Sequence, residues 1–238
     1  MVVIVIPARM GSTRFPGKPL ADLCGKPMVQ WVYERAAQSK AGDAVLVATP
    51  DREIAEAVQA FGGEAMMTSN EHETGTDRIA EVARRLDAEF YVNVQGDEPL
   101  IRPETIRACA EALTRRTAPV ASVYDSLAET EADDPNIVKV VMDRNERALY
   151  FSRAGIPYPR NARLSLWKHI GIYGYSREAL QSFAAWPQTP LERTEGLEQL
   201  RFLENGFAIQ MARGQGTELA VDTPEQLERV KSIMEKEQ

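Results

Sequence analysis

The chain opens with an unbroken β-branched run, Val2-Val3-Ile4-Val5-Ile6, which ends at Pro7. A continuous apolar run, without the alternation of a half-exposed strand, is typical of a strand buried on both faces, as in a parallel sheet covered by helices. A sheet covered on both faces needs helices between its strands, so strands and helices should alternate along the chain. The first residues therefore predict an α/β protein.

The pattern of the next residues agrees with this prediction. Within the first 125 residues we expect further strands at 44–48, 89–94 and 120–124, and helices at 27–40, 51–62, 76–86 and from 103 onward. Three or four strand-helix units predict a mostly parallel, doubly wound sheet with helices on both faces, in three layers.

The rhythm changes after about residue 125, where strands are expected at 137–142, 148–151 and 168–175 without crossover helices between them. Helices at 178–184 and 191–204, a last strand at 207–211 and a helix at 223–236 complete the chain. We predict one integrated domain with an α/β half (1–125), an antiparallel β plus helix subdomain on the same sheet (126–206), and a return strand and C-terminal helix (207–238).

Composition excludes several classes of protein. With 28 Lys and Arg against 35 Asp and Glu, the net charge of −7 argues against nucleic acid or an anionic membrane as the main partner. The sequence has neither an apolar run long enough for a membrane span nor an N-terminal signal peptide, which predicts a cytoplasmic protein. Two cysteines and two histidines offer no thiolate or imidazole cluster, so a metal here would be a hard cation held by carboxylates.

A glycine-containing loop with three cations, Arg9, Arg14 and Lys18, follows the first strand directly. Ligands of open α/β sheets bind outside the carboxyl ends of the strands, where this loop lies. It is not a P-loop, because Pro19 stands where that motif needs Ser or Thr. Free backbone N–H groups and three cations suit a polyphosphate, although a solvated basic loop is the simpler alternative.

Two carboxylates are candidates for holding magnesium beside such phosphates. Asp97, in Gln95-Gly96-Asp97-Glu98-Pro99, follows another expected strand. Asp222 precedes a helix whose capping box is complete without it, with Thr223 at the N-cap and Gln226 at N3. If Asp97 and Asp222 face each other, they form a carboxylate site.

Other polar residues give weaker signals. Composition favours a helix start at Thr76 or Asp77, a surface ion pair for Arg153 and a core or edge position for His169. Glu195, Glu198 and Gln199, spaced for one helical face, indicate a solvated surface.

Eight segments between Val2 and about Val230 occur in a fixed order, namely PAR-x-GSTR-x-PGKPL, GTDR, VNVQGDEP, VKVV, ALYFSR-x-x-IPYPR, KHIGIYGY, LEQLR and VDTPEQLE. Taken together, these segments resemble the 3-deoxy-manno-octulosonate cytidylyltransferases, the CMP-Kdo synthetases. The resemblance implies a nucleotidyltransferase fold and an enzyme that transfers CMP from CTP to the anomeric hydroxyl of 3-deoxy-manno-octulosonate (Kdo), with Mg²⁺, for lipopolysaccharide or capsule synthesis. It also implies a homodimer, formed through the 126–206 subdomain.

The resemblance also implies roles for particular residues. The catalytic residues would be Arg9, Lys18, Asp97 and Asp222, of which Asp97 and Asp222 bind the metal. CTP would contact Ala8, Arg9, Arg14, Lys18, Gly75, Arg78, Gln95 and Asp97. Kdo would contact Arg153, His169, Tyr173, Glu198 and Gln199.

Two alternatives stay open. The enzyme could act on another sugar acid, such as amino-Kdo or sialic acid, because an acid that differs at one hydroxyl is hard to exclude from sequence. A catalytically silent nucleotide sensor is disfavoured, since Lys18, Asp97 and Asp222 are all present.

Overall fold

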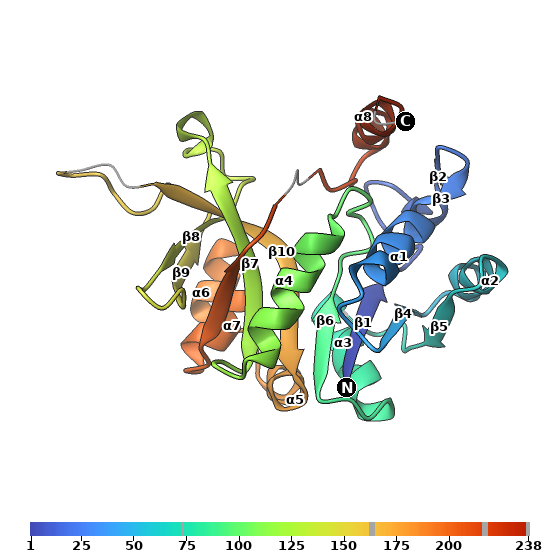
Figure 1. Cartoon of the computed structure of the whole chain (residues 1–238), viewed down its shortest axis with the longest axis horizontal. Coiled ribbons are helices and arrows are strands. Elements are labelled where there is room, and N and C mark those ends of the chain that lie inside the picture. Colours follow the sequence, from blue (N-terminus) through green and yellow to red (C-terminus); the bar gives the residue numbers. More distant parts are fainter. Residues whose placement is uncertain (73, 162–164, 216–218, 237–238) are drawn as a thin grey trace.

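The computed structural model describes residues 1–72, 74–161, 165–215 and 219–236. Most of its strands form one twisted sheet in the order β11-β7-β10-β6-β1-β4-β5 (Figure 1). The strands along this path are β1 (Val2–Pro7), β4 (Ala44–Thr49), β5 (Glu64–Met67), β6 (Phe90–Asn93), β7 (Val120–Leu127), β10 (Leu166–Ser176) and β11 (Ile209–Arg213). All of them run in one direction except β10, which is antiparallel to both of its neighbours.

The second half of the chain joins this sheet, as predicted. Strand β10 inserts between β6 and β7, and β8 (Lys139–Met142) pairs with β10 and with β9 (Ala148–Ser152), each time antiparallel. The predicted α/β fold with a mixed, mostly parallel sheet and an antiparallel extension is therefore confirmed.

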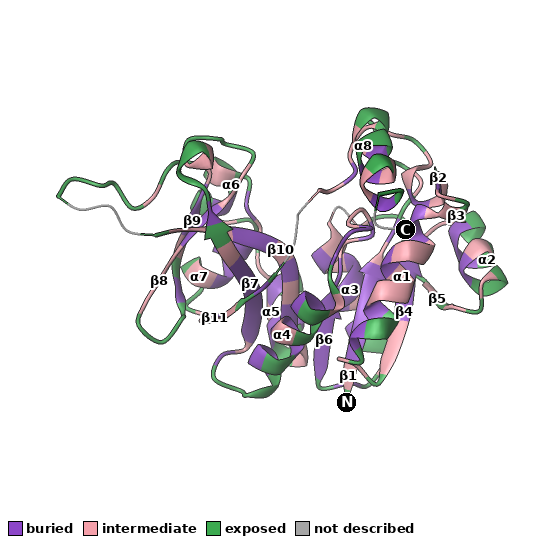
Figure 2. Cartoon of the chain, turned by 45° about the horizontal axis from the view of Figure 1, so that its top comes forward, coloured by how far each residue is buried: buried purple, intermediate pink, exposed green. Residues whose placement is uncertain are grey.

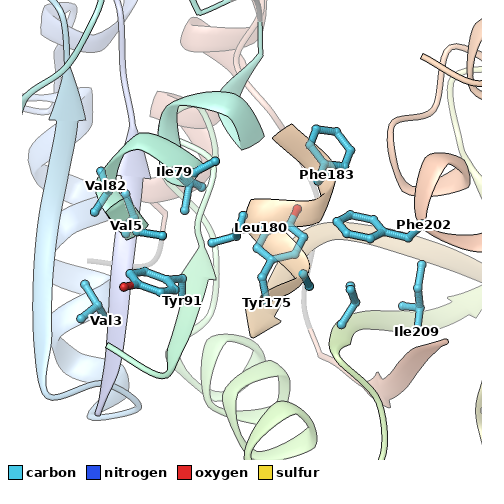
Figure 3. Packing of buried hydrophobic residues seen from close by; sticks show 14 of the residues in the cluster. Val3, Val5, Ile79, Val82, Tyr91, Tyr175, Leu180, Phe183, Phe202 and Ile209 are labelled. Carbon is cyan, nitrogen blue, oxygen red and sulfur yellow. The ribbon is translucent and has the colours of Figure 1, made fainter. Parts of the chain in front are cut away.

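Helices cover both faces of the sheet (Figure 1). On one face lie α1 (Met28–Ser39), α2 (Arg52–Ala60) and α4 (Pro103–Thr114), and on the other lie α3 (Gly75–Arg85), α5 (Arg177–Ala185), α6 (Pro190–Glu195) and α7 (Gln199–Glu204). Val3 and Val5 pack on the second face (Figure 3), and Ile4 and Ile6 pack on the first. Strand β1 is therefore buried on both faces, as its unbroken β-branched sequence predicts.

A third apolar cluster lies apart from the two sheet faces. There α8 (Pro224–Met234) packs Leu227, Val230 and Met234 against Leu23 of β2 (Asp22–Leu23) and the first residue of α1. Strand β2 and its partner β3 (Lys26–Pro27) form a small separate hairpin within the segment predicted as loop, which also holds the short helix η1 (Lys18–Leu20). This cluster fixes α8, and with it Asp222, above the carboxyl ends of the central strands (Figure 1).

Four details differ from the sequence-based expectations. Edge strand β5 was not predicted, because Glu64-Ala65-Met66-Met67 has neither β-branched residues nor a clear alternation. Helix α3 begins earlier than expected, with Thr74 rather than Thr76 or Asp77 at its N-cap. Strand β11 begins two residues later than predicted. The helix predicted at 191–204 is two helices, because Gly196 adopts a left-handed conformation (φ 65°) that ends α6.

Candidate active site

A cleft of about 350 Å³ lies at the carboxyl ends of β1 and β6. Its walls combine the glycine-containing loop after β1, the start of α3, the turn after β6 and Asp222, which lies shortly before α8. The structure brings together here every residue that the sequence analysis predicted for nucleotide binding, catalysis or metal binding: Ala8, Arg9, Arg14, Lys18, Gly75, Arg78, Gln95, Asp97 and Asp222.

Close backbone contacts hold the two strand ends together at the base of this cleft. The backbone N–H of Val94 donates to the carbonyl of Val5 at 3.1 Å. A Cβ atom on Gly96 would lie 2.8 Å from the carbonyl oxygen of Pro7, closer than a side chain tolerates. Glycine is therefore required at position 96, because the turn after β6 passes directly against the end of β1.

The centre of the cleft is an ion cluster. Lys18 Nζ lies 2.8 Å from Asp97 Oδ2 and 3.2 Å from Asp222 Oδ1, and the guanidinium of Arg14 lies 3.0 Å from Asp222 Oδ2. Both carboxylates keep about a third of their side-chain surface exposed, 30% for Asp97 and 33% for Asp222. Asp97 and Asp222 therefore converge on a single cation at the open side of the cleft.

The backbone near Asp222 fixes this arrangement. The N–H of Val221 donates to the carbonyl of Asp97 at 2.8 Å, which joins the two carboxylate-bearing segments directly. The predicted capping box at Thr223 and Gln226 is present, and the Gln226 side chain also accepts from the backbone N–H of Asp222 at 2.7 Å. The carboxylate of Asp222 takes no part in the cap and is left for the cleft.

Elsewhere in the lining, the side chains of Arg78 and His72 are held by polar contacts with neighbouring residues of the protein. The buried Arg78 guanidinium donates to Thr68 Oγ1 (2.6 Å) and to the carbonyl of Ser69 (2.9 Å), and its burial lowers its pKa. His72 Nε2 lies 2.6 Å from a carboxylate oxygen of Glu81. His72 and Arg78 therefore form an ordered wall of the cleft.

Several residues of the lining escaped sequence reasoning: Ser12, Thr13, His72, Thr74 and Gly96. Ser12 and Thr13 lie in the same loop as Arg9, Arg14 and Lys18. Their position in that loop could have predicted that their hydroxyls line the cleft. Nothing in the local sequence distinguished His72, because its partner Glu81 lies nine residues further along the chain, within α3.

A second pocket of about 330 Å³ adjoins the first, and Gly75 and Gln95 line both. Four of the five residues proposed for the sugar, His169, Tyr173, Glu198 and Gln199, line this second pocket. Its wall also includes Thr76, Val138, Gly171, Tyr175, Gly196, Leu197 and Phe202. An extended ligand could therefore reach from the ion cluster into this second space.

Glu198 and Gln199 enter the pocket from the break between α6 and α7. The expectation that they form a solvated helical face was wrong, because Gly196 ends α6 and the next residues turn inward. Glu198 accepts a hydrogen bond from Thr76 Oγ1 at 2.8 Å, and burial raises the pKa of its carboxyl. Gln199 is 3% exposed, and its side-chain Nε2 has no hydrogen-bond partner among the described residues. A buried amide without a partner is costly unless a ligand satisfies it.

The fifth residue, Arg153, lies outside this lining. Its Nε donates to the carbonyl of Glu195 at 2.8 Å and its NH1 to the carbonyl of Pro135 at 3.0 Å, while Glu195 accepts from the Arg153 backbone N–H at 3.0 Å. These bonds brace the end of α6, so Arg153 supports the turn that delivers Glu198.

Known proteins are similar to this chain over nearly its whole length. The sequence profile of the family described as cytidylyltransferase matches residues 3–232. The 3-deoxy-manno-octulosonate cytidylyltransferase of Escherichia coli is 48% identical over 237 residues, which cover 99% of this chain and 96% of the relative. The enzyme of the same name from Syntrophotalea carbinolica is 51% identical and covers 97% of both chains. The chain belongs to the 3-deoxy-manno-octulosonate cytidylyltransferase family.

Solved structures agree with this family membership. The structure of a CMP:2-keto-3-deoxy-manno-octonic acid synthetase complexed with CTP superposes with a TM-score of 0.97 at 48% identity, covering 100% of this chain and 99% of that one. A 4-diphosphocytidyl-2C-methyl-D-erythritol synthase from Anaerococcus prevotii has a TM-score of 0.65 at 11% identity, which shows a shared fold only. The resemblance first drawn from eight sequence segments is thus confirmed, and this cytidylyltransferase has the fold that its family predicts.

The buried carboxyl of Glu198 gives a testable stability prediction for this family member. Burial raises the pKa of Glu198 in the folded protein, so at neutral pH the fold bears the cost of an ionised, partly desolvated carboxylate. As pH falls through the raised pKa, the folded protein takes up a proton before the unfolded chain does, and this cost disappears. We therefore expect Glu198→Gln to increase the free energy of unfolding at neutral pH.

Urea unfolding at neutral and mildly acidic pH measures this effect. The advantage of Glu198→Gln over the unchanged protein should shrink as the pH is lowered. Glu228→Gln, on the exposed side of α8, should change stability little at either pH. A Glu198→Gln variant that is less stable at neutral pH would show that the ionised carboxylate is well satisfied in the fold.

Proposed function

We propose that this protein transfers CMP from CTP to the anomeric hydroxyl of Kdo and releases pyrophosphate. The observation that carries the proposal is the adjoining pair of pockets. One pocket is lined by four cations, Arg9, Arg14, Lys18 and Arg78, and by two carboxylates, and the other by His169, Tyr173, Glu198 and Gln199. The names of the relatives, both 3-deoxy-manno-octulosonate cytidylyltransferases, support the same reaction.

The chemistry requires a new bond between the sugar oxygen and the α-phosphorus of CTP. The bond from that phosphorus to the bridging oxygen of pyrophosphate breaks, and the sugar hydroxyl loses its proton. Negative charge grows on the phosphoryl oxygens and on the leaving pyrophosphate. Arg9, Arg14 and Lys18 line the cleft where this charge would develop, and fixed cations that stabilise such charge are a large part of catalysis.

We further propose that Asp97 and Asp222 hold Mg²⁺. The two carboxylates fit such an ion, because both already face a single cationic group, the ammonium of Lys18, and both offer the hard oxygen ligands that Mg²⁺ prefers. No group of three or more His, Cys, Asp or Glu suited to a metal exists within the described residues, so phosphate oxygens and water would complete the coordination. When bound, Mg²⁺ would neutralise phosphate charge.

The biological setting is part of the same proposal. We infer a cytoplasmic enzyme that supplies CMP-Kdo to lipopolysaccharide or capsule synthesis. In the part of the chain that the structure describes, no helix has the length and apolar character needed to cross a membrane.

We also propose a homodimer formed through residues 126–206. Several large apolar side chains of this part are exposed to solvent, namely Leu149 (61%), Tyr158 (84%) and Leu191 (40%). Figure 2 shows that residues 153–161, which follow β9, are mostly exposed where they project from the body of the molecule. Light scattering at micromolar concentration should give twice the chain mass, and a monomer would contradict the proposal.

The decisive experiment is a pyrophosphate-release assay with the purified chain, CTP, Mg²⁺ and Kdo. Parallel reactions with amino-Kdo and with sialic acid test the alternative sugar acids, and omission of Mg²⁺ tests the metal. Release with Kdo at the highest kcat/KM supports the proposal. Faster release with another acid would transfer the assignment to that acid, and no release with any acid would leave the nucleotide-sensing alternative.

A further inference from the structure

A buried serine lies directly behind His169, the histidine of the second pocket. Ser122, in the middle of β7, is 0% exposed, and its Oγ lies 2.9 Å from His169 Nε2. The same oxygen lies 2.8 Å from the carbonyl of Ile172 and 3.5 Å from that of Ile170. Ser122 therefore connects the histidine ring to the backbone of β10.

An irregularity in β10 produces this arrangement. Ile170 pairs with Val123 of β7, but the next pair along is Tyr173 with Ser122, so Gly171 and Ile172 are two additional residues on β10. Such a bulge disturbs the regular hydrogen bonding between strands and redirects side chains, often beside functional sites. Here it brings the Ile172 carbonyl to the Ser122 hydroxyl, and Gly171 and His169 both line the second pocket.

The two short contacts of Ser122 decide which ring nitrogen carries the proton. A hydroxyl has one proton to donate, and a carbonyl oxygen can only accept. If Ser122 donated to His169 Nε2, its oxygen and the Ile172 oxygen would face each other at 2.8 Å with no proton between them, which is repulsive. Both contacts are favourable only when Nε2–H donates to Ser122 and Ser122 donates to Ile172.

The surroundings of the ring agree with a neutral histidine. The His169 ring packs edge-on against Phe151, with ring centroids 5.1 Å apart, and in a tilted geometry against Tyr173, with centroids 5.2 Å apart. Burial lowers the pKa of His169 to about 3, so at neutral pH the ring carries one proton. With that proton on Nε2, the other nitrogen, Nδ1, carries a lone pair.

We propose that Ser122 is a positioning residue that holds His169 in the Nε2–H tautomer, so that Nδ1 is the acceptor that the ring offers to a hydroxyl of the sugar acid. Recognition of a sugar rests on the function proposed above, whereas the tautomer is a property of the protein alone. A neutral acceptor suits a hydroxyl donor and disfavours the sugar carboxylate. His169 thus selects the orientation of a polyhydroxylated acid within the second pocket.

Nuclear magnetic resonance of the imidazole nitrogens tests the tautomer in the ligand-free protein. The chain has only two histidines, His72 and His169, so a ¹⁵N-histidine spectrum holds two ring systems, and His72→Gln identifies the one from His169. We expect His169 with Nε2 protonated and Nδ1 bare at neutral pH. A ring with the proton on Nδ1, or a charged ring, would overturn the inference.

Kinetics of three variants test the positioning role. Ser122→Ala should shift His169 toward the other tautomer and raise the KM for Kdo roughly five- to tenfold, as expected for one hydrogen bond, with little change in the KM for CTP. Ser122→Thr, which keeps the hydroxyl, should retain the tautomer and recover most of the affinity. Ser39→Ala is the matched control, because Ser39 is equally buried and its hydroxyl also donates to a carbonyl, that of Ala36, at the end of α1.

The outcomes separate this inference from the proposed function. An unchanged tautomer and an unchanged Kdo KM in Ser122→Ala would reject the positioning role, as would equal increases in the KM values for Kdo and CTP. Failure of the unmutated protein to use any sugar acid would reject the proposed function, while the spectrum would still decide the tautomer.

Discussion

Replacing Asp222 or Asp97 with asparagine should lower kcat at least about a hundredfold while leaving the fold intact, the scale seen when a charge-stabilising group is removed from an active site. Asparagine keeps the size of the side chain but removes the negative charge. Both carboxylates lie at the open side of the cleft, bonded to Lys18, and neither belongs to a core cluster. The loss should therefore appear in turnover and not in stability.

The measurement is pyrophosphate release at saturating CTP, Kdo and Mg²⁺, together with a urea unfolding curve for each variant. Asp87→Asn provides a matched control, since Asp87 is also paired with a cation, Arg177, but its side chain is 90% exposed and lies outside both pockets. Turnover close to that of the unchanged enzyme in either cleft variant would reject the proposed metal pair.

The second large effect is expected for Lys18→Ala. Hydrogen bonds to charged groups contribute about 1.5–3 kcal/mol, so the loss of Lys18 should weaken CTP binding roughly ten- to hundredfold. Removal of the ammonium also takes away the one cation that Asp97 and Asp222 share. The negative charge of the two carboxylates would then repel a triphosphate more strongly. Kdo binding should change little, because Lys18 lines only the first pocket.

Calorimetric titration with CTP and, separately, with Kdo distinguishes the two ligands. Lys26→Ala is the control, because Lys26 is paired with Glu34 and stacked over Trp31 outside both pockets. Equal losses of affinity for CTP and Kdo would show that Lys18 maintains the structure of the site as a whole, and would contradict the assignment of the loop to phosphate.

The buried strands were predictable because their signal is local. The unbroken run at Val2–Ile6 identifies β1 without any knowledge of its neighbours, and the structure buries alternate side chains on opposite faces. Edge strand β5 lacks that signal, since none of its four residues, Glu64-Ala65-Met66-Met67, is fully buried and the run has no β-branched residue. The sequence therefore predicts strands that are fully buried, and it fails to predict a strand that is only partly buried.

The nucleotide cleft was predictable in outline, because its residues follow strand ends and a topological rule places strand ends together. Lys18 meets Asp97 across 79 residues and Asp222 across 204. Asp222 could be assigned only because the capping box did not need it.

The second pocket was not predictable from residue patterns. The residues predicted there for the sugar come from β10 and from the break between α6 and α7, and the spacing of Glu195, Glu198 and Gln199 indicated a continuous helical face. Gly196 was the available signal, since glycine commonly ends a helix. The role of Ser122 had no signal in sequence, because its partners depend on a bulge in another strand.

Asp222 lies just before the N-cap of helix α8, whose apolar residues belong to the small cluster with Leu23 and Met28 and not to either face of the sheet. An element with few buried contacts opens locally at lower free energy than the core, without global unfolding. Such an opening would withdraw Asp222 from Lys18 and Asp97. If Asp222 holds the metal as proposed, a local folding equilibrium governs the fraction of molecules able to react, and ligands that bridge Asp97 and Asp222 should slow amide hydrogen exchange in α8 more than in the sheet.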